Sequence, residues 1–172
     1  MVDATTGHEA LSFMDGSSGY NLIWMVLRDE ELTAFRTLKG IYYYKVMPFG
    51  QKNVSATYQC VMQKIFDDVL HKNVECYVDD LVVKSRKRED HLWDLRMVFD
   101  RLRRYQLKMN PLKCAFGVTS GKFLGLIVQH RGIEADQSKI AAIRHKPKLR
   151  NLNNLEVFKD VLLSFNGLFQ TL

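Results

Sequence analysis

The sequence predicts an α+β domain built on a split β-α-β arrangement, and three observations lead to that fold class. A short apolar run at residues 10–14 ends at Asp15 and a cluster of turn-forming residues, as a strand entering a loop does. Apolar residues then recur at helical spacing over residues 58–69. Two further β-type runs flank Asp79 and Asp80, and the resulting order of strands and helices is that of the split motif.

Local signals define the elements between these strands. Residues 35–46 are rich in aromatic and β-branched side chains, which predicts a strand, and Pro48 ends it. Asn53 or Ser55 caps the following helix, and the basic turn at residues 71–73 closes it. Only two residues separate the next two β-type runs, so the hairpin turn between them is expected to be tight.

The second half of the chain predicts a long helix and then one more strand. The helix opens at residues 88–90 with acidic side chains in its first turn and ends at Asn110. Its apolar stripe steps by three or four residues and comprises Leu92, Leu95, Phe99 and Leu102. Residues 122–128 predict a strand, and two more helices are expected, at residues 140–143 and 154–169.

The composition is that of an ordinary globular chain. Its 172 residues are 47% hydrophobic and 26% charged, which suits one domain, or one domain plus a fragment. No apolar run could span a bilayer, and the polar N-terminus lacks the features of a secretory signal. Three widely spaced cysteines argue against a disulfide framework and a structural zinc site. We therefore expect a cytoplasmic or nuclear protein that is not secreted and has no membrane partner.

The positive charge is concentrated in one stretch. The whole chain has a net charge of +6, and residues 84–113 carry ten basic and four acidic side chains, which alone give +6. Such a stretch is compatible with a polyanion-binding surface, but the composition favours the solvated face of a helix, because runs of charge usually lie at the surface.

Three carboxylates are expected to converge at one edge of the predicted sheet. In the split arrangement, Asp15 at the end of the first strand lies beside the turn that carries Asp79 and Asp80. Carboxylates packed together repel each other, and Mg²⁺ is a hard cation that binds several of them together with substrate phosphates. Two such ions about 4 Å apart catalyse in-line phosphoryl displacement. An Asp-Asp pair is, however, also common in ordinary hairpin turns.

The motifs around these carboxylates resemble those of reverse transcriptases. Residues 77–80, Tyr-Val-Asp-Asp between two apolar strands, resemble the catalytic hairpin of that family, and residues 11–15 with 19–21 resemble its first palm motif. Residues 47–50, Met-Pro-Phe-Gly, resemble the form seen in gypsy-type long-terminal-repeat retrotransposons. Further matching motifs lie at residues 52–53, 56–59, 107–111, 113–114, 123–125 and 130–133.

The resemblance covers about residues 2–150 and implies an RNA-directed DNA polymerase that transfers nucleotides by a two-metal mechanism. Asp15, Asp79 and Asp80 would be the catalytic carboxylates and would bind two Mg²⁺ ions, for which Mn²⁺ could substitute. The backbone carbonyl of Gly16 would complete one metal shell. The partners would be an RNA or DNA template with its primer, and deoxynucleoside triphosphates.

The resemblance also implies roles for residues around the metal site. Tyr20, five residues after Asp15, would lie under the incoming sugar and clash with a 2′-hydroxyl. The nucleotide would rest on Phe49 and Gly50. Residues assigned to template or primer are Lys52, Gln59, Tyr77, Phe123, Leu124 and Gly125. For all but the carboxylates and Tyr20, a purely structural role is an equal alternative.

By resemblance, residues 1–150 are a polymerase palm with part of the fingers at about residues 28–46, and residues 151–172 begin a thumb or connection. By the same resemblance, residues 1–172 lack the N-terminal fingers and a full thumb, the parts that clamp the triphosphate and the duplex. We therefore expect no primer extension by residues 1–172 alone. One alternative is an inactive retrotransposon relic that binds nucleic acid weakly at most. Another is a two-metal nuclease, which would not need a sugar-gating tyrosine. The oligomeric state is left open.

Overall fold

The computed structural model describes residues 2–17, 19–135, 137 and 140–141. The predicted helices near residues 140–143 and at 154–169 lie largely or wholly outside the described residues, as does the segment 151–172. In the part of the chain that is described, no helix is long and apolar enough to cross a membrane.

A five-stranded sheet forms the centre of the fold, in the strand order β4-β5-β1-β6, with β7 also pairing with β1. Its strands are β1 (Ala10–Ser17), β4 (Val74–Tyr77), β5 (Asp80–Ser85), β6 (Lys108–Met109) and β7 (Ala115–Val118). Strand β1 runs antiparallel to β5, which in turn forms a hairpin with β4. The predicted split β-α-β arrangement is therefore confirmed.

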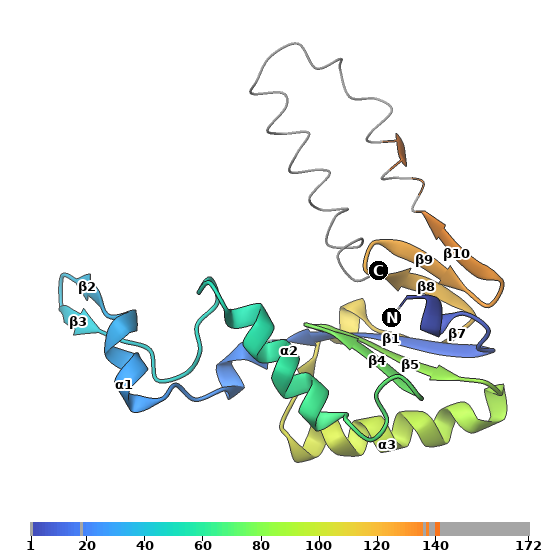
Figure 1. The fold of residues 1–172 in the computed structure, drawn as a ribbon, viewed down its shortest axis with the longest axis horizontal. Coiled ribbons are helices and arrows are strands. Elements are labelled where there is room, and N and C mark those ends of the chain that lie inside the picture. Colours follow the sequence, from blue (N-terminus) through green and yellow to red (C-terminus); the bar gives the residue numbers. More distant parts are fainter. Residues whose placement is uncertain (1, 18, 136, 138–139, 142–172) are drawn as a thin grey trace, which may run out of the picture.

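Two helices cover one face of this sheet, as Figure 1 shows. They are α2 (Val54–Ile65) and α3 (His91–Arg104). Alternate residues of the strands point toward them, because successive side chains of a strand face opposite sides. The main hydrophobic core lies in this layer and includes Met14, Tyr58, Met62, Phe66, Val74, Cys76, Leu81, Val83, Leu95, Val98 and Leu102.

A second, three-stranded sheet packs on the opposite face. It consists of β8 (Ser120–Phe123), β9 (Leu126–Gln129) and β10 (Gly132–Ala135). A smaller core forms between the two sheets from Leu11, Phe13, Val82, Phe123 and Val128. The prediction of a single strand at 122–128 is wrong, because Leu124 and Gly125 have φ angles of 52° and 78° and turn the chain between β8 and β9.

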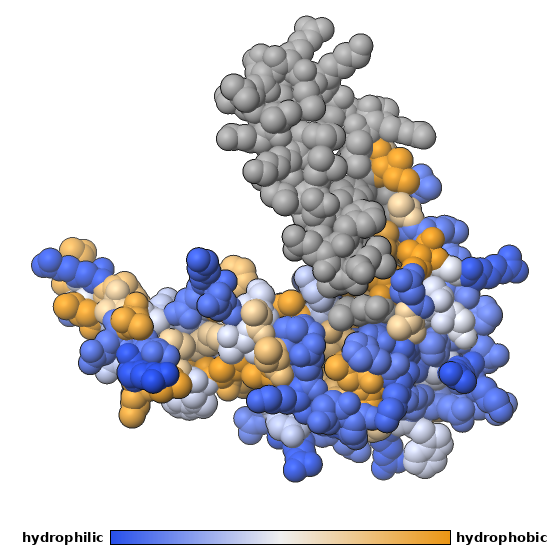
Figure 2. All heavy atoms as spheres, viewed as in Figure 1, coloured by the Kyte–Doolittle hydropathy of each residue, from blue (hydrophilic) through white to orange (hydrophobic). Residues whose placement is uncertain are grey.

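An arm, residues 23–47, extends away from the central sheet (Figure 1). It contains α1 (Leu27–Glu30) and the short hairpin strands β2 (Phe35–Thr37) and β3 (Gly40–Tyr42). The predicted single strand at 35–46 is therefore divided by a tight turn before Gly40. The arm carries exposed hydrophobic side chains, and orange regions mark it in Figure 2. Its exposed large side chains include Leu27, Leu32, Leu38, Ile41 and also Trp24.

Helix α3 begins as predicted, after the 3-10 turn Arg88–Asp90, but it ends at Arg104 rather than at Asn110. Its buried face also differs from the predicted stripe. Leu95 and Leu102 are buried, but Leu92 is 76% exposed. The polar His91 takes the first buried position instead.

His91 is buried because two serine hydroxyls satisfy its ring nitrogens. The Nε2 atom lies 2.7 Å from Ser12 Oγ on β1, and the Nδ1 atom lies 2.8 Å from Ser85 Oγ on β5. Ser85 also donates to the Asp94 carboxylate. Burial lowers the pKa of His91, and the nearby Asp94 charge only partly opposes this effect. The neutral imidazole therefore joins the start of α3 to two strands.

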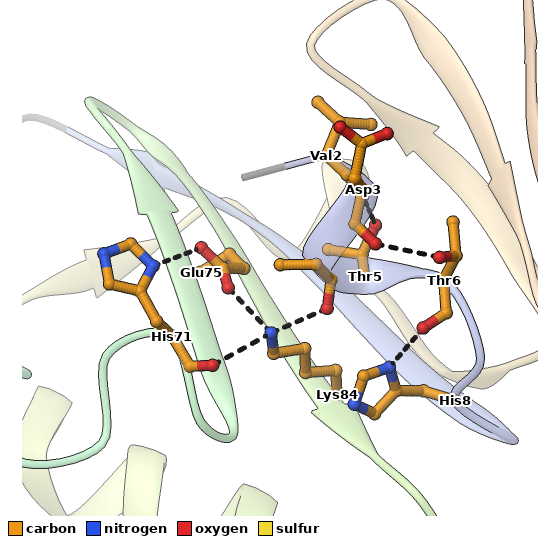
Figure 3. Close-up of polar contacts among 9 residues, drawn as sticks. Val2, Asp3, Thr5, Thr6, His8, His71, Glu75 and Lys84 are labelled. Atoms are coloured by element: carbon orange, nitrogen blue, oxygen red, sulfur yellow. Dashed lines mark hydrogen bonds and ion pairs between the residues drawn. The ribbon is translucent and has the colours of Figure 1, made fainter. Parts of the chain in front are cut away.

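A buried ion pair connects the N-terminal segment to the β4–β5 hairpin (Figure 3). Lys84 Nζ donates to Glu75 Oε1 at 2.7 Å and to the carbonyls of Ala4 and His71 at 2.7 and 3.3 Å. His71 Nδ1 lies 2.9 Å from the other Glu75 oxygen. Lys84 is 2% exposed, so one of the ten basic residues in the 84–113 stretch is structural.

We predict that acid weakens the fold through His91. Because its pKa is lowered in the folded state, the unfolded chain takes up a proton that the folded chain excludes. The free energy of unfolding should therefore fall as pH drops below about 6.5, the ordinary pKa of histidine. Urea unfolding at pH 7.5 and at pH 5.5 measures this change. The free energy of unfolding should differ less between the two pH values for His91→Gln than for the wild type. The exposed-residue control His130→Gln should retain the wild-type difference, and an unchanged difference in His91→Gln would contradict the assignment.

Candidate active site

The structure places the three predicted carboxylates at one edge of the central sheet. Asp15 and Asp80 are direct partners across the antiparallel pair of β1 and β5. Asp79 lies in the two-residue turn between β4 and β5. The Gly16 backbone N–H donates to the Asp79 carbonyl at 2.7 Å, so the end of β1 and the turn are joined directly. The topology thus brings together residues that are 64 positions apart in the sequence.

Two of these carboxylates, Asp79 and Asp80, are destabilised in their charged forms. Burial raises the pKa of Asp79 and of Asp80, and the Asp15 charge raises both further. The Asp79 Oδ1 atom is buried and has no hydrogen-bond partner among the described residues. A buried carboxylate oxygen without a partner is energetically costly. Across the described part of the chain, no three His, Cys, Asp or Glu side chains are already arranged to hold a metal ion.

Lys113 is a site residue that sequence reasoning did not identify as one. Its Nζ atom lies 3.3 Å from Asp15 Oδ2, and its charge lowers the pKa of both Asp79 and Asp80. Strand β6 pairs with Gly16 and positions the following 3-10 turn, Pro111–Lys113, beside the carboxylates. The sequence placed a lysine in a matching motif but held no signal that this turn returns to Asp15.

An aromatic cluster borders the carboxylates. Tyr20 is 9% exposed, and its ring centroid lies 4.7 Å from that of Tyr58 and 6.0 Å from that of Phe49. A methyl group at Gly19 would lie 2.1 Å from the Tyr58 hydroxyl and 2.5 Å from its ring, so only glycine allows this packing. Burial raises the pKa of Tyr58, and the nearby Asp79 charge adds to the shift. The sequence placed Tyr58 on the apolar stripe of the predicted helix and in a matching motif, but gave it no role at the site.

The turn that carries Asp79 is contacted by Gln59 from helix α2. Gln59 Oε1 accepts a hydrogen bond from the Val78 backbone N–H at 2.6 Å, and Gln59 Nε2 donates to the Cys76 carbonyl at 3.0 Å. Val78 has a φ angle of 51°, a left-handed conformation that β-branched residues rarely adopt. The sequence predicted a tight turn here but not its conformation or its contact with α2.

The remaining predicted site residues lie in two groups. Phe49, Gly50 and Lys52 are exposed in the segment that leads into α2. Phe123 is a core residue at 2% exposure, and it shares the smaller core with partly buried Tyr77 and Leu124. The turn formed by Leu124 and Gly125 therefore packs on the sheet face opposite α2.

Comparison with known proteins identifies the family. Residues 1–128 match the model of the reverse transcriptase (RNA-dependent DNA polymerase) family. The chain is 36% identical over 145 residues to the retrovirus-related Pol polyprotein from transposon opus of Drosophila melanogaster. The aligned segment covers 84% of this chain and 14% of that protein. It is 28% identical over 152 residues to the transposon Tf2-3 polyprotein of Schizosaccharomyces pombe. That aligned segment covers 88% of this chain and 11% of that protein.

Solved structures show the same fold. A foamy viral protease-reverse transcriptase in complex with an RNA/DNA hybrid matches with a TM-score of 0.81 and 20% identity, over 93% of this chain and 22% of that one. The same viral protein in complex with dsDNA matches with a TM-score of 0.80, over 96% of this chain and 34% of that one. The α+β fold expected from the resemblance is confirmed, and the transposon relatives are consistent with the gypsy type. The chain belongs to the reverse transcriptase family and spans a small part of the polyproteins to which it is similar.

Proposed function

We propose that this chain forms the palm of an RNA-directed DNA polymerase, in which two divalent ions assist template-directed nucleotidyl transfer. The observation that carries the proposal is the partnerless Asp79 Oδ1 atom beside the cross-strand pair of Asp15 and Asp80. Membership of the reverse transcriptase family supports the reaction class. The substrates would be deoxynucleoside triphosphates and a primer on an RNA or DNA template.

The donor atoms at the sheet edge suit Mg²⁺, or Mn²⁺ in its place. Asp15, Asp79 and Asp80 offer carboxylate oxygens, and Gly16 offers its backbone carbonyl; hard cations prefer such oxygen ligands. Asp79 has a buried oxygen that nothing in the described chain satisfies. When bound, the two ions would activate the primer hydroxyl and neutralise charge on the phosphates. The remaining catalytic work, which is positioning, belongs to the chain's own side chains.

Tyr20 is suited to select the sugar of the incoming nucleotide. Its ring is buried and packs against the buried ring of Tyr58, so it cannot easily move aside for an extra hydroxyl group. Selection by a rigid clash is a form of discrimination against the wrong substrate. Exposed Phe49, whose ring centroid lies 6.0 Å from that of Tyr20, and the exposed Gly50 that follows it would contact the nucleotide.

Lys52 and the β8–β9 turn would contact the nucleic acid. Lys52 is exposed just before α2, where its charge could contact a template phosphate. Leu124 and Gly125 would position the primer terminus, supported by the packing of Leu124 and Phe123 in the smaller core. Lys113 adds a positive charge beside Asp15, at the place where phosphate charge would accumulate.

We predict that Mn²⁺ binds at Asp15 and Asp79. In a Mn²⁺ titration followed by NMR, paramagnetic broadening should first affect the amide signals of residues 15, 16, 79 and 80, and Asp79→Asn should weaken the effect about tenfold or more. Binding should be weak, because part of the ion's shell comes from substrate phosphates. Asp67→Asn, a change at an exposed aspartate beyond α2, serves as the control. Broadening centred on another part of the chain would contradict the proposed site.

We predict that Asp79→Asn also stabilises the metal-free fold at neutral pH. The substitution removes a charge that burial and Asp15 both disfavour, so the free energy of unfolding should rise by about 1 kcal/mol. Urea unfolding at pH 7.5 measures the change. Because the pKa of Asp79 is raised in the folded state, the folded wild type takes up a proton there before the unfolded chain does. The stability difference between Asp79→Asn and the wild type should therefore shrink as pH falls toward about 4. An equal gain for Asp67→Asn would show that general charge reduction is the cause.

We predict that Tyr20→Ala relaxes sugar selection in a polymerase that carries this palm. The ratio of kcat/KM for deoxyribonucleotides to that for ribonucleotides should fall by about tenfold or more, because the clash is removed. Tyr20→Phe is the matched control, since it retains the ring and removes only the hydroxyl that lies near Asp79. Its ratio should remain close to that of the wild type. If Tyr20→Ala leaves the ratio unchanged, Tyr20 is not the gate.

A further inference from the structure

The turn between β4 and β5 is strained at the residue before Asp79. Tyr77 and Asp80 are the last paired residues of the hairpin, so Val78 and Asp79 form the whole turn. Val78 has a φ angle of 51°. A branched β-carbon makes this left-handed conformation unfavourable, and it persists only where the surroundings hold it. The turn therefore requires contacts from outside the hairpin.

Gln59 supplies contacts on both sides of the strained residue. Its side-chain oxygen accepts from the Val78 N–H at 2.6 Å, and its side-chain nitrogen donates to the Cys76 carbonyl at 3.0 Å. The helix that carries it is fixed against the sheet by the buried side chains of Tyr58 and Met62. The Gln59 amide is thus a bridge between a fixed helix and the backbone of the turn.

We propose that Gln59 is a positioning residue that holds the Val78–Asp79 turn in its strained conformation and so holds the Asp79 carboxylate beside Asp15. The importance of this position for catalysis rests on the function proposed above, whereas the restraint on the turn does not. The second restraint on the turn is the bond from the Gly16 N–H to the Asp79 carbonyl at 2.7 Å. Together they fix the turn from the helix side and from the strand side.

This role differs from the template contact that the family resemblance implies for Gln59. Both the oxygen and the nitrogen of the Gln59 amide already bond to hairpin backbone. The amide still has a second N–H hydrogen and a second oxygen lone pair, so any template contact would be additional to these two bonds and would not replace them. A positioning role also accounts for a polar, only partly buried side chain on the face of α2 that meets the hairpin.

The test uses four variants of the full chain. Gln59→Leu removes both hydrogen bonds at similar size, and Gln59→Met is a milder form in case the first does not fold. Gln63→Leu is the matched control, because Gln63 lies one turn later on α2 and is exposed. The fourth variant combines Gln59→Leu with Val78→Gly, since glycine adopts a positive φ without strain.

Amide hydrogen exchange measures the restraint without any metal. Exchange at Val78 should be about tenfold faster in Gln59→Leu than in the wild type, because its hydrogen loses its acceptor. Amides of β1 and β5 should keep their wild-type rates, and Gln63→Leu should match the wild type throughout. The Asp79 Cα chemical shift should move in Gln59→Leu and return toward the wild-type value in the double variant. Unchanged Val78 exchange, or a shift that glycine does not restore, would overturn the proposal.

Mn²⁺ binding separates this proposal from the proposed function. Broadening of the Asp15 and Asp79 signals should need about tenfold more Mn²⁺ in Gln59→Leu, and the double variant should regain most of the wild-type affinity. If Gln59→Leu lowers Val78 protection while Mn²⁺ binds with unchanged affinity, the positioning role is overturned. If the wild type itself shows no Mn²⁺ binding at these residues, the proposed function fails, and the exchange and chemical-shift results alone decide whether Gln59 restrains the turn.

Discussion

The antiparallel pairing of β1 with β5 is the constraint on which the rest of the structure depends. Its register places Asp15 opposite Asp80 and Leu11 opposite Lys84. A slip by one residue would reverse the face of every side chain on the strand. Such a slip would turn Leu11 and Phe13 away from the smaller core and Met14 away from the main one. Because β1 is buried on both faces, two separate cores fix its register. The same register fixes the position of the carboxylates at its end.

Buried charged groups are fully paired at one end of the β4–β5 hairpin and incompletely paired at the other. At one end, Glu75 and Lys84 are buried as a pair, and Lys84 has three acceptors. At the other end, Asp79 has a partnerless oxygen and lies beside a second carboxylate. The same short strands thus carry a satisfied ionic site and an unsatisfied one. Local violations of this kind are characteristic of functional sites, and the well-packed core between the two ends compensates for them.

Some elements followed from signals within a short stretch of sequence, whereas features that depend on distant contacts were not predicted. The hairpin around Asp79 and the start of α3 follow from local patterns. The exposed Leu92 does not, because the buried position beside it goes to His91, whose partners Ser12 and Ser85 lie on two strands. For the site, the convergence of the carboxylates follows from the order of elements. The approach of Lys113 depends instead on the pairing of β6 with the end of β1, which no local pattern encodes.

Helix α2 sets the spacing between the two halves of the candidate site. Tyr58 and Gln59 are neighbours on this helix and point to different parts of the site, since successive helical residues differ by about 100° in direction. Tyr58 packs against Tyr20, and Gly19 leaves room for its ring, while Gln59 bonds to the turn that carries Asp79. A displacement of α2 would therefore move the aromatic surface and the carboxylate together. Helix α2 therefore supports both the proposed nucleotide position and the proposed metal position, and support from a rigid element gives a site its precision.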